Sequence, residues 1–552
     1  MKKIAMLVIA LALTAALLSG CALPALVAAL TGVKSQTEPV PYVEEEIELE
    51  EDGLAYDIAY EAAATGAIMN RAMPSMSYED FNTEEYAAVK ENGFRKVATD
   101  PLSTFSADVD TASYCNLRRM LNDGWALDSI PSGAVRVEEM LNYFRYDYAA
   151  PNAGEKFGVT AQLAPCPWNP DNLLLALGAR AADAPEAAEG GSNLVFLVDV
   201  SGSMAYEDKL PLVQRALTML VDELTEADTV SIVTYASGEE ILIEGASPVK
   251  DKAKLLSVID GLYADGSTNG QRGLAQAYEV AAKYLRPKGN NRVIMCSDGD
   301  LNVGITSESD LHDYVSQQRK TGIYLSVLGF GDGNYKDTKM ETLADDGNGN
   351  YYYIDSILEA RKVLCEELTQ TLYAVADDVK FQIEFNPAKV SAWRQIGYEN
   401  RALENQDFED DKKDAGEVGA GAMVTVLYEL VPAGEGAEDS GLKYQSSSLT
   451  EAAAGGEWLT LSTRYKEPGQ DESKLQTNVI DDTALTDAPS GDFNFACAVA
   501  EFGMLLGRSE HKGDIDYSDV LDLLKRTELS DDYREELFSL VKIAQRLDRL
   551  NG

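Results

Sequence analysis

Apolar runs of strand length alternate with amphipathic helical patterns between residues 193 and 373. The segment "NLVFLVD" (193–199) is an unbroken apolar run that ends at an aspartate, and "LVQRALTMLVDEL" (212–224) carries one apolar stripe at helical spacing. The alternation continues with strand-like runs at 229–237, 291–298, 322–331 and 351–355, and with helical patterns at 251–262, 270–286, 308–320 and 356–372. Such alternation builds a parallel sheet with helices on both faces. The pattern therefore predicts an α/β domain over 193–373.

The regions on either side of this domain have a different pattern. Apolar and polar residues alternate at 379–385, 422–431 and 458–465, which predicts a β-rich, sandwich-like region over 374–466. Short strand-like pieces at 156–181, within the segment 151–192, are expected to pair with these strands. The α/β domain would then be an insertion into one β-rich region.

Small helical modules complete the predicted organisation. Helical patterns predict an N-terminal module at 99–150 and C-terminal helices at 493–552, which follow a Ser/Asp/Gly-rich linker at 467–492. One stripe in the last of these helices is expected to pack inside the protein. Its members are Leu537, Leu540, Val541, Ala544 and Leu547.

The N-terminus has the layout of a secretory signal. Residues 1–21 contain two lysines, an apolar stretch and then the segment Leu18-Ser19-Gly20-Cys21. This segment resembles the lipobox of bacterial lipoproteins, in which the cysteine is acylated, although a plain signal peptide with a chance cysteine is the alternative. Residues 22–98, which include the acidic block "EEEIELEEDG", are expected to form a disordered tether. The prediction is a lipid-anchored, extracytoplasmic protein of the cell membrane or envelope.

Charge and cysteine content exclude several kinds of protein. The 552-residue chain has 92 acidic and 47 basic residues and a formal net charge of −45, so nucleic acid is not an expected partner. Apart from Cys21, five cysteines occur without a C-x-x-C pair, which indicates neither a zinc site nor a complete disulfide framework. A bridge between Cys115 and Cys166 stays open.

Oxygen-bearing side chains gather where strands of the α/β domain are predicted to end. Asp199, Ser201 and Ser203 follow the first strand, Thr268 lies in "DGSTNG" (265–270), and Asp298 follows the strand at 291–298. In parallel sheets, ligands bind beyond the carboxyl ends of the strands. Carboxylate and hydroxyl oxygens are ligands for hard cations such as magnesium.

These residues carry a family resemblance. The segment 193–373 resembles the von Willebrand factor type A (VWA) domain, a Rossmann-like fold whose metal-ion-dependent adhesion site consists of D-x-S-x-S, a threonine and an aspartate on three loops. Asp199, Ser201, Ser203, Thr268 and Asp298 match this pattern in full. The resemblance implies that they bind Mg²⁺, or Mn²⁺ or Ca²⁺, and that the ion accepts a Glu or Asp of a protein partner. Segments such as "VRVEEMLNYF" and "CPWNP" resemble the flanking regions of a bacterial family of VWA lipoproteins and secreted proteins.

A binding or adhesion protein, not an enzyme, is therefore the predicted function. An envelope assembly or structural protein is one alternative, in which the site holds another subunit. A metal-dependent hydrolase is the other, since a bound cation can activate water. However, the chain has only His312 and His511, and the sequence shows no separate general base near Asp199.

Overall fold

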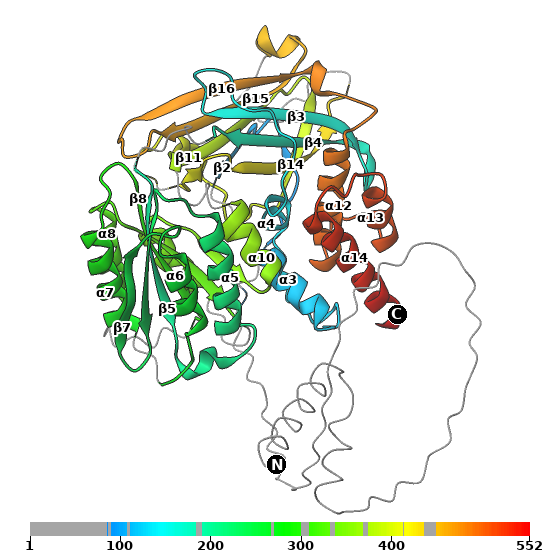
Figure 1. Cartoon of the computed structure of the whole chain (residues 1–552). Helices are drawn as coiled ribbons and strands as arrows, with labels where there is room; N and C mark the ends of the chain where they lie inside the picture. Colours follow the sequence, from blue (N-terminus) through cyan, green and yellow to red (C-terminus); the bar gives the residue numbers. More distant parts are fainter. Residues whose placement is uncertain are drawn as a thin grey trace, which may run out of the picture. The chain divides into compact units, whose positions relative to one another are not determined.

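The α/β domain is organised by β5 (Ser192–Asp199), a central strand of its sheet (Figure 1). Every residue of β5 is buried. Leu194, Phe196 and Val198 pack in one core with helices α5 (Leu210–Glu223), α6 (Lys252–Asp260) and α10 (Ile357–Arg361). The alternate residues Val195 and Leu197 pack with α7 (Gly270–Lys283), α8 (Glu308–Arg319) and α9 (Asp337–Asp346). Because neighbouring side chains of a strand point to opposite faces, this burial pattern requires helices on both sides of the sheet.

The sheet of the α/β domain has the strand order β10-β9-β8-β5-β6-β7. Its other strands are β6 (Thr229–Tyr235), β7 (Glu239–Ala246), β8 (Asn290–Ser297), β9 (Tyr324–Phe330) and β10 (Tyr351–Ile354). All neighbours pair in parallel except β6 and β7. The predicted parallel sheet covered by helices is confirmed. Strand β7 and helix α9 were not predicted. In β7 the sequence "EEILIEGA" mixes acidic and apolar residues, because this edge strand is half exposed.

This computed structural model describes residues 86, 90–107, 111–183, 190–266, 270–299, 308–331, 337–367, 374–411, 413, 415–434 and 449–551, all within one compact unit. The predicted signal segment 1–21 with Cys21, most of the predicted tether, and Thr268 lie outside these residues. No helix in the described ranges is both long and apolar enough to cross a bilayer.

Two mostly antiparallel sheets form the predicted sandwich. The first has the order β1-β12-β14-β4-β3, and the second has the order β13-β11-β15-β16 with β2 also paired to β11. Leu177 of β4, Ile383 of β11 and Leu461 of β15 lie in one buried cluster between the sheets. The strands are β1 (Arg95–Lys96), β2 (Leu102–Ser106), β3 (Phe157–Cys166), β4 (Asn169–Ala181), β11 (Ala374–Phe385), β12 (Val390–Ile396), β13 (Val418–Gly419), β14 (Met423–Pro432), β15 (Glu457–Lys466) and β16 (Ser473–Asp481).

The sandwich is built from segments on both sides of the α/β domain. Strand β4 pairs with β14 along its length, with Leu177 opposite Val426, and this is the pairing predicted for 156–181. The two ends of the inserted domain lie close together. The Ala182 amide donates to the Lys156 carbonyl oxygen (2.9 Å), and the Lys156 ammonium donates to the Val375 carbonyl oxygen (3.4 Å).

Three segment assignments need correction. The predicted linker 467–492 contains β16, the predicted helical module 99–150 contains β2, and the predicted tether includes the short strand β1. Strand β16 lies at the edge of its sheet, and its apolar residues Leu475 and Val479 are 59% and 51% exposed. A strand that buries few of its apolar side chains lacks the alternating pattern by which buried strands are recognised.

The helices outside the α/β domain share one apolar core. They are α3 (Ala112–Asn122), α4 (Val137–Asn142), α12 (Gly491–Leu506), α13 (Tyr517–Leu524) and α14 (Asp532–Asn551). In α14 the predicted stripe is buried from Leu537 to Ala544, and Leu547 packs against the same cluster, so internal packing is confirmed. Short turns of 3₁₀ helix occur at Ser132–Ala134, Gly202–Ala205, Asn405–Phe408, Ala452–Ala454 and Asp482–Ala484, and a π-helical turn at Lys362–Glu366.

Candidate metal site at the ends of β5 and β8

The described part of the predicted site lies at the carboxyl ends of two neighbouring parallel strands. Asp199 is the last residue of β5, and Asp298 directly follows β8, which pairs with β5 with Val198 opposite Cys296. Ser201 and Ser203 lie in or beside the 3₁₀ turn that follows β5. Both residues are buried, with Asp199 at 0% and Asp298 at 5% exposure over the whole residue. Four of the five predicted residues therefore gather at one edge of the sheet.

Short hydrogen bonds hold the first loop in place. The Ser201 amide donates to Asp199 Oδ1 (2.8 Å), and the hydroxyl oxygens of Ser201 and Ser203 are 3.1 Å apart. The Gly202 amide donates to the Gly266 carbonyl oxygen (3.0 Å), which ties this loop to the described end of the loop that carries Thr268. Thr268 itself lies outside the described residues, so its part in the site stays a prediction.

Burial controls the electrostatics of Asp199. Loss of water raises its pKa to about 6, hydrogen bonds from Ser201 oppose that increase, and the charge of Asp298 adds to it. A further hydroxyl comes from Ser297, which donates to Asp199 Oδ2 (3.4 Å). Two acidic side chains placed together in a buried position are costly unless a cation accompanies them.

The side chains present fit a divalent cation of the hard type. The donors among the described residues are two carboxylates and two hydroxyls, with no thiol or imidazole, and such oxygen sets suit Mg²⁺, Mn²⁺ or Ca²⁺. One cation of the chain's own is also present: the Lys209 ammonium donates to Asp298 Oδ2 at 2.9 Å. Lys209 was not among the predicted site residues.

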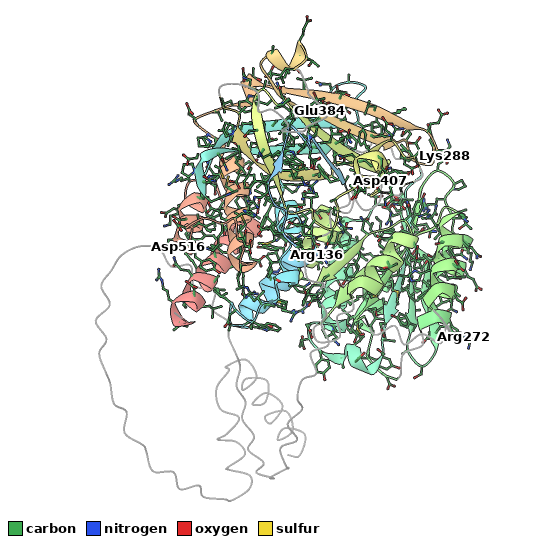
Figure 2. All side chains as sticks on the ribbon, turned by 180° about the vertical axis from the view of Figure 1, so that it is seen from behind. Arg136, Arg272, Lys288, Glu384, Asp407 and Asp516 are labelled. Carbon is green, nitrogen blue, oxygen red and sulfur yellow. The ribbon has the colours of Figure 1, made fainter. Side chains whose placement is uncertain are left out.

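Aromatic side chains are exposed in the loops beside the site. Tyr206, three residues after Ser203, is 67% exposed, and Tyr263, in the loop that leads to Gly266, is 73% exposed. Figure 2 shows Arg272, near the start of α7, and Lys288, just before β8, at opposite ends of the α/β domain. The site lies at the end marked by Arg272, since the parallel strands run from the Lys288 end toward it.

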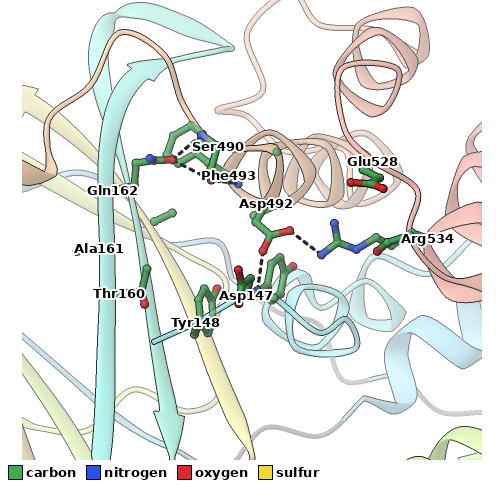
Figure 3. Close-up of a pocket in the computed structure, with 15 residues that line it drawn as sticks. Asp147, Tyr148, Thr160, Ala161, Gln162, Ser490, Asp492, Phe493, Glu528 and Arg534 are labelled. Atoms are coloured by element: carbon green, nitrogen blue, oxygen red, sulfur yellow. Dashed lines mark hydrogen bonds and ion pairs between the residues drawn. The ribbon is translucent and has the colours of Figure 1, made fainter. Parts of the chain in front are cut away.

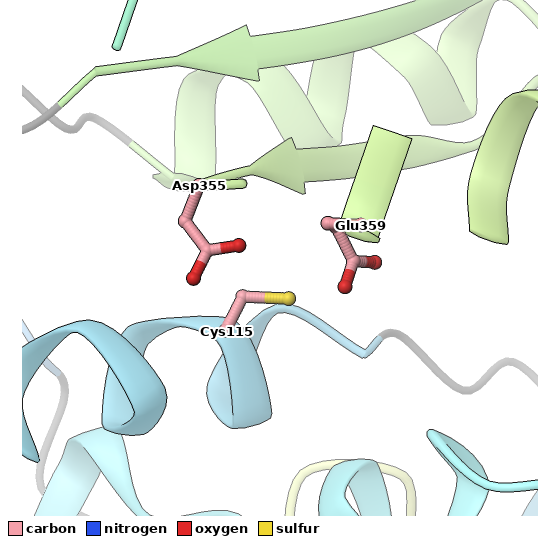
Figure 4. Close-up of side chains that lie close together, drawn as sticks. All are labelled: Cys115, Asp355 and Glu359. Atoms are coloured by element: carbon pink, nitrogen blue, oxygen red, sulfur yellow. The ribbon is translucent and has the colours of Figure 1, made fainter. Parts of the chain in front are cut away.

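A second group of potential metal ligands is instead an ion-pair cluster. Cys115, Asp355 and Glu359 bring a thiol and two carboxylates close together (Figure 4). The Arg118 guanidinium occupies this place. It donates to both oxygens of Asp355, to Glu359 (2.9 Å) and to Cys115 Sγ (3.4 Å), so a protein cation already pairs with both carboxylates of the group.

Another concave feature lies between the sandwich and the C-terminal helices (Figure 3). This cavity of about 440 Å³ is lined by β3, by the start of α12 and by Arg534 of α14. Two of its charged groups bind one another: Asp492 accepts a hydrogen bond from Arg534 (2.8 Å), and it accepts a second from the Asp147 amide (2.6 Å). The cavity therefore lies at a junction between elements that the contacts of Asp492 hold together.

The cysteines take no part in the candidate site. Cys115 and Cys166, for which a bridge was left open, are both free and buried, and Cys296, a residue of β8, lies in the core.

Comparison with known proteins agrees with this geometry. The family described as "von Willebrand factor type A domain" matches residues 193–364, which is the α/β domain, and the family described as "von Willebrand factor" matches 80–176. The family "Uncharacterized protein YfbK, C-terminal" matches 370–547. The protein is therefore a VWA-domain protein with flanking regions on both sides.

A full-length relative defines the family more closely. The uncharacterized protein YfbK of Escherichia coli (strain K12) is 41% identical over 472 residues, which is 84% of this chain and 81% of the relative. The chain belongs to the YfbK family of VWA-domain proteins.

More distant similarity is found to two further proteins. A segment is 25% identical over 174 residues to inter-alpha-trypsin inhibitor heavy chain H3 of Mesocricetus auratus, covering 30% of this chain and 19% of that protein. Among solved structures, a von Willebrand factor type A protein from Catenulispora acidiphila is 15% identical, with coverage of 72% of this chain and 91% of that chain and a TM-score of 0.37. At this TM-score the solved structure supports no further inference about the chain.

Proposed function

We propose that the chain is a membrane-anchored, extracytoplasmic binding protein whose VWA domain holds a divalent cation and captures an acidic residue of a protein partner. Asp199, Ser201, Ser203, Thr268 and Asp298 would hold the cation, with Mg²⁺ as the first choice. When bound, the cation supplies an electrophilic site for a carboxylate from the partner. The proposal rests above all on the gathering of Asp199, Ser201, Ser203 and Asp298 at one sheet edge.

The surroundings of the site support binding of a protein. Tyr206 and Tyr263 are exposed beside it, and exposed aromatic side chains are enriched where proteins bind one another. A general base for hydrolysis has no comparable support. His312 pairs with Asp346 of α9, and His511 packs edge-on against Phe94, so both histidines are engaged elsewhere.

Anchoring is the second part of the proposal. Cys21 would be acylated and would hold the protein on a membrane, because each buried methylene of an acyl chain contributes about 0.8 kcal/mol. The folded part would then be presented outside the cytoplasm at the end of the acidic segment.

The deciding experiment is a pull-down from envelope and extracellular extracts with the full chain as bait. Wild type in Mg²⁺ should capture a partner that is lost in chelator and in the variants Asp199→Ala and Asp298→Asn. The variant Asp100→Asn, which changes an acidic residue of an exposed ion pair, is the matched control and should behave as wild type. Equal capture in Mg²⁺ and in chelator would contradict the metal-bridged mechanism.

The same extracts test the lipid anchor and the alternative of an envelope assembly protein. Cys21→Ser should move the chain from the membrane to the soluble fraction, whereas an unchanged distribution would refute the lipid anchor. Capture of a resident envelope subunit in stoichiometric amount would favour the alternative of an assembly protein.

A further inference from the structure

Lys209 forms a buried ion pair with one of the proposed metal ligands. Its side chain is 7% exposed, that of Asp298 is 0% exposed, and the distance from Nζ to Oδ2 is 2.9 Å. The two residues come from different parts of the fold, because Lys209 directly precedes α5 whereas Asp298 follows β8. Buried lysines are rare unless they are paired, so we count Lys209 and its contact with Asp298 as part of the site.

The side chain of this lysine packs closely against a glycine. Gly331, which follows β9 and has a φ of +81°, lies against the lysine stem: a Cβ there would be 2.3 Å from Cε and 2.6 Å from Cγ of Lys209. The ring of the exposed Tyr206 lies 5.6 Å from Nζ. The ammonium is therefore held toward Asp298 by packing on one side and by an aromatic face on the other.

We propose that Lys209 is a built-in competitor of the divalent cation, a tethered positive charge that neutralises Asp298 when no metal is bound and lowers the affinity of the site for Mg²⁺. This inference rests on the proposed function, because it concerns the cation that Asp199 and Asp298 would hold. It adds a regulatory property, since Mg²⁺ must share or displace the contact between Lys209 and Asp298.

The direction of the effect follows from charge. The two carboxylates and Lys209 together carry a net charge of −1, whereas the same site without the ammonium carries −2. Attraction for a dication rises with that negative charge, most of all where water is excluded. A lysine that only positions Asp298 by its hydrogen bond predicts the opposite, namely weaker metal binding when the lysine is lost.

Two substitutions distinguish charge from positioning. Lys209→Met removes both the charge and the donor, whereas Lys209→Gln removes the charge and keeps an N–H donor. Lys362→Met is the matched control, because Lys362 is an equally buried lysine that pairs with Glu367 (2.5 Å). Mg²⁺ alone is titrated into the full chain by calorimetry, and thermal unfolding is followed with and without Mg²⁺.

Competition predicts that both Lys209 variants bind Mg²⁺ about tenfold more tightly than wild type, while Lys362→Met binds as wild type does. A Lys209→Met chain that folds only in Mg²⁺ would support the same conclusion, because the metal would replace the missing cation. If that variant does not fold at all, Lys209→Gln decides.

The other outcomes separate this inference from the proposed function. Binding in the variants but not in wild type would support competition while contradicting metal-dependent capture by the natural protein. Equal or weaker binding in the variants would overturn competition and leave the metal site standing. Absence of Mg²⁺ binding in every chain would overturn both.

Discussion

Glu501 shows how a single buried residue makes this protein sensitive to pH. It lies on α12 with 1% exposure, and its Oε2 has no hydrogen-bond partner among the described residues. Burial raises the pKa of this carboxyl to about 8, and the charge of Asp519 adds to the increase. The folded protein therefore keeps a proton on Glu501 at pH values where the unfolded chain has lost it.

The sign of the resulting pH dependence follows directly. Between the ordinary glutamate pKa of about 4.5 and the folded value of about 8, the folded state binds more protons than the unfolded state. The free energy of unfolding therefore falls as pH rises through this window, and Glu501 has no further effect above it.

Glu501→Gln should remove this loss of stability. We expect the variant to exceed wild type by about 3 kcal/mol at pH 7 and to match it near pH 4, because glutamine resembles the protonated acid. Urea unfolding at the two pH values measures the difference. Glu535→Gln, at an exposed position of α14, is the control and should show no such change. A constant offset at both pH values would refute the assignment.

At the scale of elements, Arg118 connects three helices from distant parts of the chain. It lies on α3, contacts Asp355 and Glu359 at the end of β10 and in α10, and donates to Glu536 of α14 (2.8 Å). The hydroxyl of Tyr143 accepts a further hydrogen bond from it (3.0 Å). One buried guanidinium thus joins the last helix of the VWA domain to the helices outside it.

Arg118→Met should strongly destabilise the protein. Removal of one partner from a buried ion pair leaves uncompensated charges and costs about 3–5 kcal/mol, so the midpoint of urea unfolding should fall at pH 7. Part of the loss should be recovered on acidification, since the orphaned carboxylates can then take up protons.

Arg95→Met tests whether this loss is specific to the buried cluster. Its pair with Asp100 is exposed, so its removal should cost less than about 1 kcal/mol. An equal effect of the two substitutions would contradict the importance of burial for the Arg118 cluster.

Local sequence signals explain which elements and which site residues could be predicted. Buried strands such as β5 and β8 contain apolar runs, Asp199 is the last residue of β5, and Ser201 and Ser203 follow it within four residues. By contrast, β16 is an edge strand with exposed apolar residues, and no local pattern distinguishes it from a linker.

Contacts between distant residues had no such signal. Lys209 and Asp298 are 89 positions apart, and Arg118 and Asp355 are 237 apart, so neither pair could be found from spacing alone. In the sequence, Lys209 stands next to the start of an apolar helix, and Arg118 stands within a helix that has apolar residues. These positions do not predict buried partners, because lysine and arginine also occur in such places without them.

At the largest scale, the described residues form a sandwich with a VWA domain inserted between β4 and β11, together with a group of helices. Because β14 pairs with β4 across the insertion, the sandwich is complete only after most of the chain has been made. The ends of the insertion meet at Lys156, so the sandwich needs no inserted domain to bring Ala182 and Val375 together.

Excision should therefore leave a folded protein. We expect a chain in which a short Gly/Ser linker replaces residues 184–373 to keep β-rich circular dichroism and a cooperative, though lower, thermal transition, since Arg118 loses Asp355 and Glu359. A chain that lacks residues 423–432 is the control and should not fold, because β14 lies between β4 and β12. Loss of cooperative unfolding on excision would contradict the inserted architecture.

The closeness of the two insertion ends also has a mechanical consequence. Tension applied by a captured partner at the Asp199 end of the domain would reach the sandwich through two covalent connections that leave it side by side near Lys156. The load would then divide between these two tethers and enter the sandwich through β4 in one sheet and β11 in the other. The Arg118 contacts with Asp355 and Glu359 are non-covalent, so they would break before either covalent tether does.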